Sequence, residues 1–276
     1  LLNDESNPHH VPGGKVVIGY PGGSPSLAVS YERVEKFTAQ LRDEFGVKIV
    51  DSIEEVAEHS DAILLESVDG RQHLEQFAKI APFGKPVFID KPIATSKRET
   101  EEIFALAEKH GAPVFSSSSL RYAAGVYELG AGEEILGCEA FGPASLIEDF
   151  PALFWYGIHS AEILFSKMGT GCRRVQVDMT EKVDMVTGIW DDGRVGTLYG
   201  HRFKGVSAFG ATVFTPGGVR HALAGSEPPY YALLLRRVVE FFKSGKSPVD
   251  PVETIEIAAF LEAANKSRLT GEPVAL

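Results

Sequence analysis

An aspartate and a lysine stand together where an apolar run in the sequence stops. The run is Val87-Phe88-Ile89, and Asp90-Lys91-Pro92 follows it directly. Pro92 has no backbone N–H for a strand ladder, and it pushes Lys91 into an extended conformation. The pattern therefore predicts a buried strand with Lys91 at its carboxyl end. A lysine beside an acid at that place can donate a proton or polarise a hydroxyl or carbonyl group. The alternative is an ordinary surface ion pair.

A second candidate is a histidine near the start of an apolar segment. The spacing predicts a helix over Phe154 to Met168, which contains His159. Gly157 lets another backbone or a ligand approach closely, and Tyr156 is either a core residue or a wall for a substrate ring. His159 is therefore either a packed, hydrogen-bonded residue or a group that carries a proton.

Polar residues also collect after another predicted strand, Ala62 to Leu65. They lie in the segment from Glu66 to His73, where the candidates are Ser67, Asp69 and His73, with the apolar Val68 beside them. Asp69 is either the cap of a helix or part of a loop that faces a cofactor at the edge of a sheet.

A run of serines marks a change in the chain after the last strand of this kind, Pro113 to Phe115. Ser117 to Ser119, Arg121 and Tyr122 follow that strand. Such a run is normally a loop, but this one would lie at the same sheet edge as Lys91.

Strand and helix patterns alternate at short spacing up to about residue 117. This alternation predicts βαβ units and a parallel sheet with right-handed crossovers. One predicted helix, Tyr31 to Phe45, has Val34, Phe37, Leu41 and Phe45 on one stripe. From Val175 onward the strands follow one another through hairpin signals, which predicts an antiparallel sheet.

Composition excludes several classes of function. The 276 residues carry a formal net charge of −11 and 44% hydrophobic residues, so the chain can bury a core but lacks the basic face that nucleic acid or an anionic membrane requires. No apolar run approaches the roughly 20 residues that span a bilayer. The two cysteines form no C-x-x-C, and the histidines, including His201, lack ligand spacing, so we expect no metal.

The glycine-rich signature of a dinucleotide site is missing. Gly19-Tyr20-Pro21-Gly22-Gly23 has the wrong spacing for G-x-G-x-x-G, and Gly169-Thr170-Gly171 lacks the third glycine. The chain starts with Leu1-Leu2-Asn3-Asp4, which is neither an initiator methionine nor a signal peptide. Either the chain was processed or residues upstream of Leu1 are missing. In the second case a strand, a glycine loop and most of a helix would lie there, as would any targeting signal. We take the cytoplasm as the default location.

Four segments together resemble the Gfo/Idh/MocA family, named for glucose–fructose oxidoreductase, inositol dehydrogenase and a rhizopine-catabolism protein. The segment from Gly84 to Pro92 is similar to the family's strand that ends in Glu-Lys-Pro, with aspartate for glutamate. Ser67-Val68-Asp69 with His73 resembles Thr-Pro-Asn…His, and Ser119-Leu120-Arg121-Tyr122 resembles Asn-x-Arg-Phe. Residues 155–162 resemble Asp-x-Gly-x-His-x-x-Asp, with Trp155 at the place of the first acid.

The resemblance covers nearly the whole chain. It implies an α/β protein of two domains. Residues 1–118 would be a Rossmann-type domain, incomplete at its N-terminus, that binds NAD or NADP. Residues 119–250 would be an α/β domain with a large, mainly antiparallel sheet. Residues 251–276 would be a C-terminal helix and tail that pack back on the first domain.

The resemblance also implies roles for single residues. Lys91 and His159 would be catalytic. Contacts to the cofactor would come from Ser67, Val68, Asp69, His73, Asp90, Lys91 and Arg121, and contacts to the substrate from Tyr156, Arg121 and His201.

The function that the resemblance implies is hydride transfer between the cofactor and a sugar, cyclitol or related polyol. The protein would form a homo-oligomer, a dimer or a tetramer, through the antiparallel sheet. Two alternatives stay open: an NAD-assisted glycosidase or lyase of the same family, and a non-catalytic relative that binds a ligand. The residues that would distinguish NAD from NADP lie in the turn between Gly19 and Ser24.

Overall fold

The computed structural model describes all 276 residues, which divide into two compact units. Unit 1 contains Leu1–Ala94, Arg98–Ser116 and Leu234–Val249, and unit 2 contains Thr95–Lys97, Ser117–Leu233 and Asp250–Leu276. The chain passes from unit 1 to unit 2 after Ser116, and the predicted boundary was residue 118. The segment Leu234–Val249 belongs to unit 1, although the sequence places it in the second domain.

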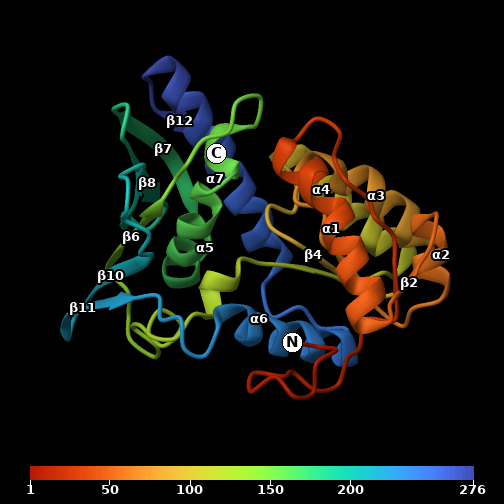
Figure 1. Ribbon diagram of the computed structural model, residues 1–276. Coiled ribbons are helices and arrows are strands. Elements are labelled where there is room, and N and C mark those ends of the chain that lie inside the picture. The colour runs from red at the N-terminus through yellow and green to blue at the C-terminus, as the bar shows by residue number, and fades with distance from the viewer. The chain divides into compact units, whose positions relative to one another are not determined.

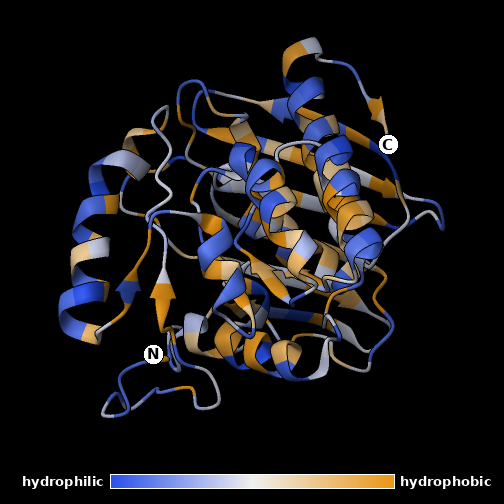
Figure 2. Cartoon of the chain, turned by 90° about the vertical axis from the view of Figure 1, so that its right-hand side faces the viewer, coloured by the Kyte–Doolittle hydropathy of each residue, from blue (hydrophilic) through white to orange (hydrophobic).

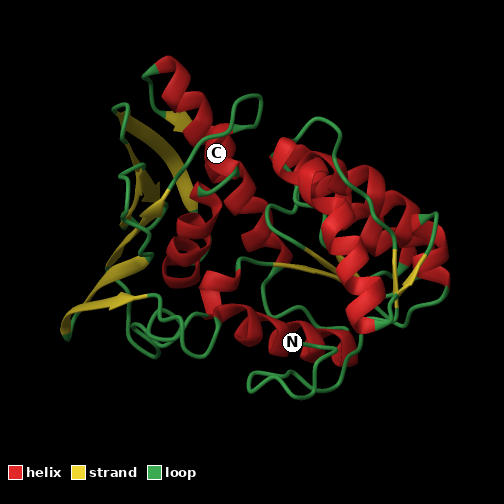
Figure 3. Ribbon diagram, in the orientation of Figure 1, coloured by secondary structure: helices red, strands yellow, loops and turns green.

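Unit 1 is built on short parallel strands, which Figure 3 shows among its helices. Three of them form one sheet in the order β3-β4-β5: β3 (Ile63–Leu65), β4 (Val87–Ile89) and β5 (Val114–Ser116). Two others, β1 (Ile18–Gly19) and β2 (Lys48–Ile49), form a separate parallel pair. The helices between the strands are α1 (Ala28–Phe45), α2 (Ile53–Glu58), α3 (His73–Ile80) and α4 (Lys97–His110).

The core of unit 1 lies around β4, whose three residues are all buried. Phe77 and Ile103 are fully buried in one cluster with Val87 and Ile89. Burying side chains of this size stabilises the fold by about 1.5–3 kcal/mol each. Opposite them, the Phe88, Phe115 and Phe241 rings pack edge to face in series at 5.3 and 5.7 Å. Phe241 comes from α6 (Tyr230–Ser244), which explains why most of this helix belongs to unit 1.

The predicted helix over residues 31–45 lies within α1, and its apolar stripe is not buried. None of the 18 residues of α1 is buried, and Figure 2 shows hydrophobic residues scattered along it. Phe37 and Leu41 are 48% and 37% exposed. The neighbouring pair β1–β2 has only two residues in each strand, so it offers little apolar surface to cover the stripe.

Unit 2 is a seven-stranded sheet with the helices α5 (Gly157–Met168) and α7 (Pro251–Thr270) on one face, as Figure 1 shows. The strand order is β11-β10-β6-β9-β8-β7-β12, and only the pair β6–β9 is parallel. The strands are β6 (Gly137–Pro143), β7 (Cys172–Met179), β8 (Val183–Trp190), β9 (Val195–His201), β10 (Gly210–Thr215), β11 (Gly218–Leu223) and β12 (Val274–Ala275). Burial alternates along β8, so one face of the sheet is core and the other faces outward.

The last helix, α7, packs against this sheet within unit 2, and its packing on the first domain, which the resemblance implied, stays a prediction. Its Ser267 hydroxyl accepts a hydrogen bond from the Val177 N–H of β7 at 3.0 Å. Arg268 and Arg202 both bind the fully buried carboxylate of Asp184 on β8. These polar contacts and the short strand β12, which pairs with β7, fix α7 to the sheet.

No helix in the chain is both long enough and apolar enough to cross a bilayer.

Candidate functional site

Lys91 lies at the carboxyl end of β4, as the sequence predicted. The N–H of the preceding Asp90 donates to the Leu65 carbonyl at 2.9 Å, so β3 and β4 end at the same level of the sheet. Both charged side chains are half-buried. Burial lowers the pKa of Lys91 although the Asp90 carboxylate opposes this, and burial raises the pKa of Asp90 against the opposing charge of Lys91. A lysine with a lowered pKa releases its proton more easily than a free lysine does.

His73 holds the loop after β4 to the loop after β3. It is fully buried, and its Nδ1 lies 3.0 and 3.1 Å from the Pro92 and Ile93 carbonyl oxygens. Its Nε2 lies 2.6 Å from the Ser67 carbonyl oxygen. Burial lowers the pKa of His73, whereas these carbonyls and Asp90 favour its protonated form. Because both ring nitrogens are engaged with backbone, His73 acts on the geometry around Lys91 and offers no ring atom to a cofactor.

Close approach of these two loops also depends on a glycine. A Cβ at Gly70 would lie 2.8 Å from both the Pro92 ring and the Pro92 carbonyl oxygen. Asp69, just before it, is buried and accepts hydrogen bonds from Ser24 and Arg71 on both carboxylate oxygens. The Asp69 carboxylate is therefore a structural anchor, and the accessible residues of this loop are Ser67 and Val68.

Glu66 belongs to the polar segment predicted after β3, but it was not among the predicted site residues. It follows β3 directly, just as Asp90 follows β4. Its side chain reaches solvent, but surrounding protein atoms and the Asp90 charge raise the pKa of Glu66 to about 8. Two neighbouring carboxyl groups with raised pKa values thus lie at the edge that carries Lys91.

In unit 2, the imidazole of His159 lies in a slot with two aromatic walls. The Tyr156 and Phe209 rings pack edge to face on it, with centroid distances of 5.4 and 5.5 Å. Phe209 can enter the slot because Gly142 has no Cβ. A Cβ at that position would overlap the Phe209 ring. The third contact is the Ser118 hydroxyl, whose oxygen lies 2.7 Å from His159 Nδ1. His159 remains partly exposed, so the slot orients the ring without closing it.

Arg121 lies inside unit 2. It sits in a 3-10 helix, Ser119–Tyr122. Its guanidinium binds Glu162 of α5 at 2.7 Å and Glu253 of α7 at 2.5 Å. Arg121 is 7% exposed, and with both carboxylates bound it fixes the Ser118 loop to two helices.

His201 is the last residue of β9. Its carbonyl oxygen accepts a hydrogen bond from the N–H of Ala144, the residue that follows β6. The ring is 4% exposed and stacks on Phe203 at 5.1 Å, and burial lowers the pKa of His201. Its Nδ1 is buried without a hydrogen-bond partner. A polar atom of this kind normally meets water or a ligand.

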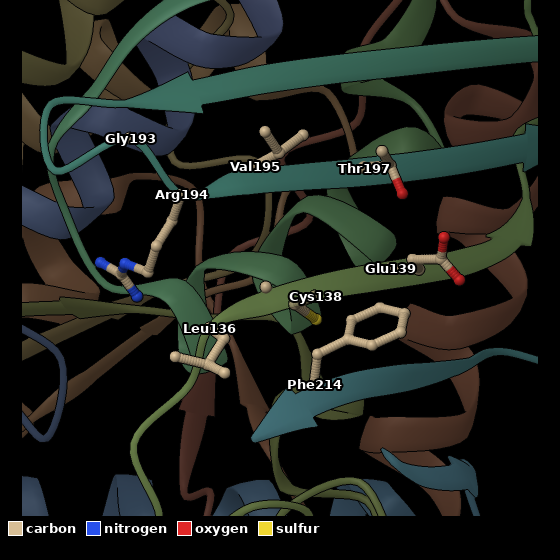
Figure 4. Close-up of a pocket in the computed structure, with 9 residues that line it drawn as sticks. Leu136, Cys138, Glu139, Gly193, Arg194, Val195, Thr197 and Phe214 are labelled. Carbon is tan, nitrogen blue, oxygen red and sulfur yellow. The ribbon is translucent and has the colours of Figure 1, made fainter. Parts of the chain in front are cut away.

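A cavity of about 370 Å³ lies elsewhere in unit 2, where the parallel strands β6 and β9 begin. Figure 4 shows Glu139, Thr197 and Phe214 around it, on the outward face of the sheet. The guanidinium of Arg194 is bound to Asp192 and to two backbone carbonyls, so it is not available for an anionic ligand. This cavity starts at Gly137 and Val195, whereas His201 lies at the far end of β9.

Tertiary contacts produce the site features that the sequence did not show. Ser118 is 41 residues from His159, and Glu253 is 132 residues from Arg121. Ser118 lies in the serine run described above, whereas Glu253 was not a predicted site residue. Phe209 gave no signal in the sequence. No group of three or more His, Cys, Asp or Glu side chains in the chain is arranged to hold a metal ion.

The carboxyl edge of β3–β5 fits one half of a dinucleotide. Ser67, Val68 and Lys91 are accessible there, at the ends of neighbouring parallel strands, which is where such sheets bind nucleotides. The other half needs a glycine loop at a helix N-terminus for its pyrophosphate. Residues 1–276 contain no G-x-G-x-x-G, and β1–β2 is not bonded into the β3–β5 sheet.

Comparisons with known proteins agree with this arrangement. Residues 26–118 match the GFO_IDH_MocA family model, described as an oxidoreductase family with an NAD-binding Rossmann fold. A search of the curated proteins found no match.

Solved structures share the fold over most of the chain. Myo-inositol 2-dehydrogenase from Lactobacillus plantarum is 16% identical with a TM-score of 0.76, over 96% of this chain and 93% of that one. GenD2 from gentamicin A biosynthesis, solved with NAD, is 17% identical with a TM-score of 0.75, over 88% and 87%. Myo-inositol dehydrogenase from Lactobacillus casei, solved with NAD(H) and myo-inositol, is 14% identical with a TM-score of 0.75, over 95% and 89%.

Proposed function

Because the chain is an oxidoreductase of the Gfo/Idh/MocA family, we propose that it transfers hydride between a nicotinamide dinucleotide and a hydroxyl-bearing carbon of a sugar, cyclitol or related polyol. Lys91 carries the proposal, because burial lowers its pKa at the carboxyl end of a parallel strand, within the segment that matches the NAD-binding family. The polyol class is supported by the L. casei enzyme of the same fold, which was solved with myo-inositol.

Two side chains of the protein would handle the substrate hydroxyl. When bound, NAD or NADP supplies the hydride acceptor. Lys91 would hydrogen-bond the reacting oxygen and stabilise negative charge on it. His159, held by its slot but partly exposed, would take the hydroxyl proton as a general base and return it in the reverse direction. We assign Ser67, Val68 and Asp90 to the cofactor edge.

Other predicted contacts divide into two groups. Tyr156 beside His159, and His201 with its unpartnered Nδ1, are proposed substrate contacts. His73, Asp69 and Arg121 are engaged inside the protein, so we assign them to positioning.

A panel of polyols and sugars tests the function with NAD and with NADP, by following NADH or NADPH absorbance. We expect Lys91→Met and His159→Ala to abolish turnover while both variants still bind NADH by fluorescence titration. Full turnover by either variant would contradict the assignment. Product formation without net NADH would indicate a glycosidase or lyase instead, and no NADH binding by the wild-type protein would indicate a non-catalytic relative.

We also propose that the outward face of the seven-stranded sheet joins copies of the chain into a dimer or tetramer. Val195, Phe214, Val219 and Leu223 expose 37–60% of their surface on this face. Apolar side chains grouped on one face are typical of an interface. Sedimentation of the wild-type protein and of Val219→Lys tests this, and an unchanged mass would argue against the face.

The unpaired thiols of Cys138 and Cys172 support a reducing compartment such as the cytoplasm.

A further inference from the structure

The histidine proposed as the proton carrier has no acid one helical turn before it. That position is Trp155, which is 8% exposed and packs edge to face on Phe150 at 5.5 Å. An imidazole that transfers protons needs a partner on its second nitrogen, because that partner fixes the ring orientation and the tautomer. Another group must therefore meet Nδ1 of His159.

Ser118 supplies that group. Its hydroxyl oxygen lies 2.7 Å from His159 Nδ1, at the short end of the range for hydrogen bonds to nitrogen. The same oxygen accepts a hydrogen bond from the Leu120 N–H at 3.1 Å, so the serine also caps the 3-10 helix that follows. Ser118 is fully buried, which leaves the hydroxyl no exchange with bulk water.

The position of Ser118 is fixed from the other side by buried charges. Its backbone N–H hydrogen-bonds to the Glu162 carboxylate, and that carboxylate binds Arg121. Glu162 lies on the same helix as His159, less than one turn further along. The serine loop and the histidine are therefore held to each other at two points.

We propose that Ser118 is the positioning residue of His159, and that its neutral hydroxyl takes the place of a carboxylate partner. The proposal rests on the function proposed above. A carboxylate can only accept a hydrogen bond, whereas a hydroxyl can donate to a neutral Nδ1 or accept from a protonated one. A hydroxyl also adds no negative charge, so it stabilises the imidazolium less than a carboxylate would.

The first test compares two neighbouring serines in steady-state kinetics. We expect Ser118→Ala to lower kcat on the order of 10²-fold, with little change in KM, because the ring loses its orientation. Ser119→Ala, a buried serine one position along the same loop, is the matched control and should retain kcat. Ser118→Thr, which keeps the hydroxyl, should recover activity relative to Ser118→Ala. Unchanged kcat in Ser118→Ala would overturn the proposal.

The second test does not depend on finding a substrate. Imidazole NMR signals of ¹⁵N-labelled protein are followed against pH, and His159→Gln identifies the His159 signal among the eight histidines. We expect Ser118→Ala to change the Nδ1 shift of His159, and Ser118→Asp to move its titration midpoint up by about 1 unit or more. If Ser118→Ala leaves the Nδ1 shift as in the wild type, the proposal fails. Because this result comes without turnover, it separates failure of the positioning role from failure of the proposed function.

Discussion

Arg121 Nε and Glu162 Oε2 lie 2.7 Å apart in the interior of unit 2, with side chains 9% and 5% exposed. The family resemblance implied contacts from Arg121 to the cofactor and to the substrate. The structure gives it two internal carboxylates, and burial raises the pKa of Glu162 even though the guanidinium opposes this. The role of Arg121 is therefore to join the Ser118 loop to α5 and α7.

We expect Arg121→Met to lower the free energy of unfolding by about 3–5 kcal/mol, because it leaves two carboxylates without their cation. Denaturant unfolding measures the loss. Arg173→Met removes a cation from the exposed pair with Asp191, and it should cost less than about 1 kcal/mol. If the two variants lost the same amount, the buried pair would not hold the loop.

The pKa of Glu66 makes stability depend on pH. Its value in the folded protein is about 8, against a usual value of 4.5. A carboxyl group with a raised pKa binds its proton more tightly when folded, so its stabilising contribution is complete below pH 4.5 and is lost as the pH rises to about 8. We expect Glu66→Gln to become progressively more stable than the wild type over this window, and the difference to stay constant above it.

Denaturant unfolding at several pH values between 4.5 and 9 checks this. Glu32→Gln, on the exposed surface of α1, is the control. Its difference from the wild type should not follow the same curve. A constant difference for Glu66→Gln across the window would contradict the raised pKa.

A charge-conserving substitution tests the proposed role of Lys91. Arginine keeps the positive charge but does not lose its proton in proteins. The longer, planar guanidinium cannot place a donor where the Lys91 ammonium would hydrogen-bond the reacting oxygen, so Lys91→Arg should lower kcat on the order of 10²-fold. Lys85, whose ammonium donates to the Ala57 and Glu58 carbonyls, provides the matched control. Lys85→Arg should keep kcat near the wild-type value, and equal activity of both variants would contradict a catalytic Lys91.

Sequence periodicity was sufficient wherever neighbours along the chain decide the structure. The apolar run before Asp90 forms β4. One of the hairpin signals, Asp191-Asp192-Gly193, forms the turn between β8 and β9, with Gly193 at a φ of +86°. The placement of His159 near a helix start was also correct. These features depend on strand alternation, turn chemistry and helix spacing, which a local window contains.

Features that depend on distant parts of the chain could not be predicted. The Ser118–His159 contact and the Arg121–Glu253 pair join elements that meet only after folding. The assignment of α6 to unit 1 follows from the contact between Phe241 and Phe115, 126 positions apart. A helical stripe likewise shows which side chains share a face, but not whether anything covers that face, as α1 illustrates.

The exposed stripe of α1 leads to a last prediction, made with two phenylalanines of unit 1. Phe37 is 48% exposed and its ring contacts Arg33, whereas Phe77 on α3 is fully buried in the core. We expect Phe77→Ala to lower the free energy of unfolding by about 3–5 kcal/mol, through lost burial and the cavity it leaves. Phe37→Ala should change it by no more than about 0.5 kcal/mol, because little of its surface is removed from water. Denaturant unfolding of both variants checks this. A loss for Phe37→Ala as large as that for Phe77→Ala would show that another surface covers α1 in solution.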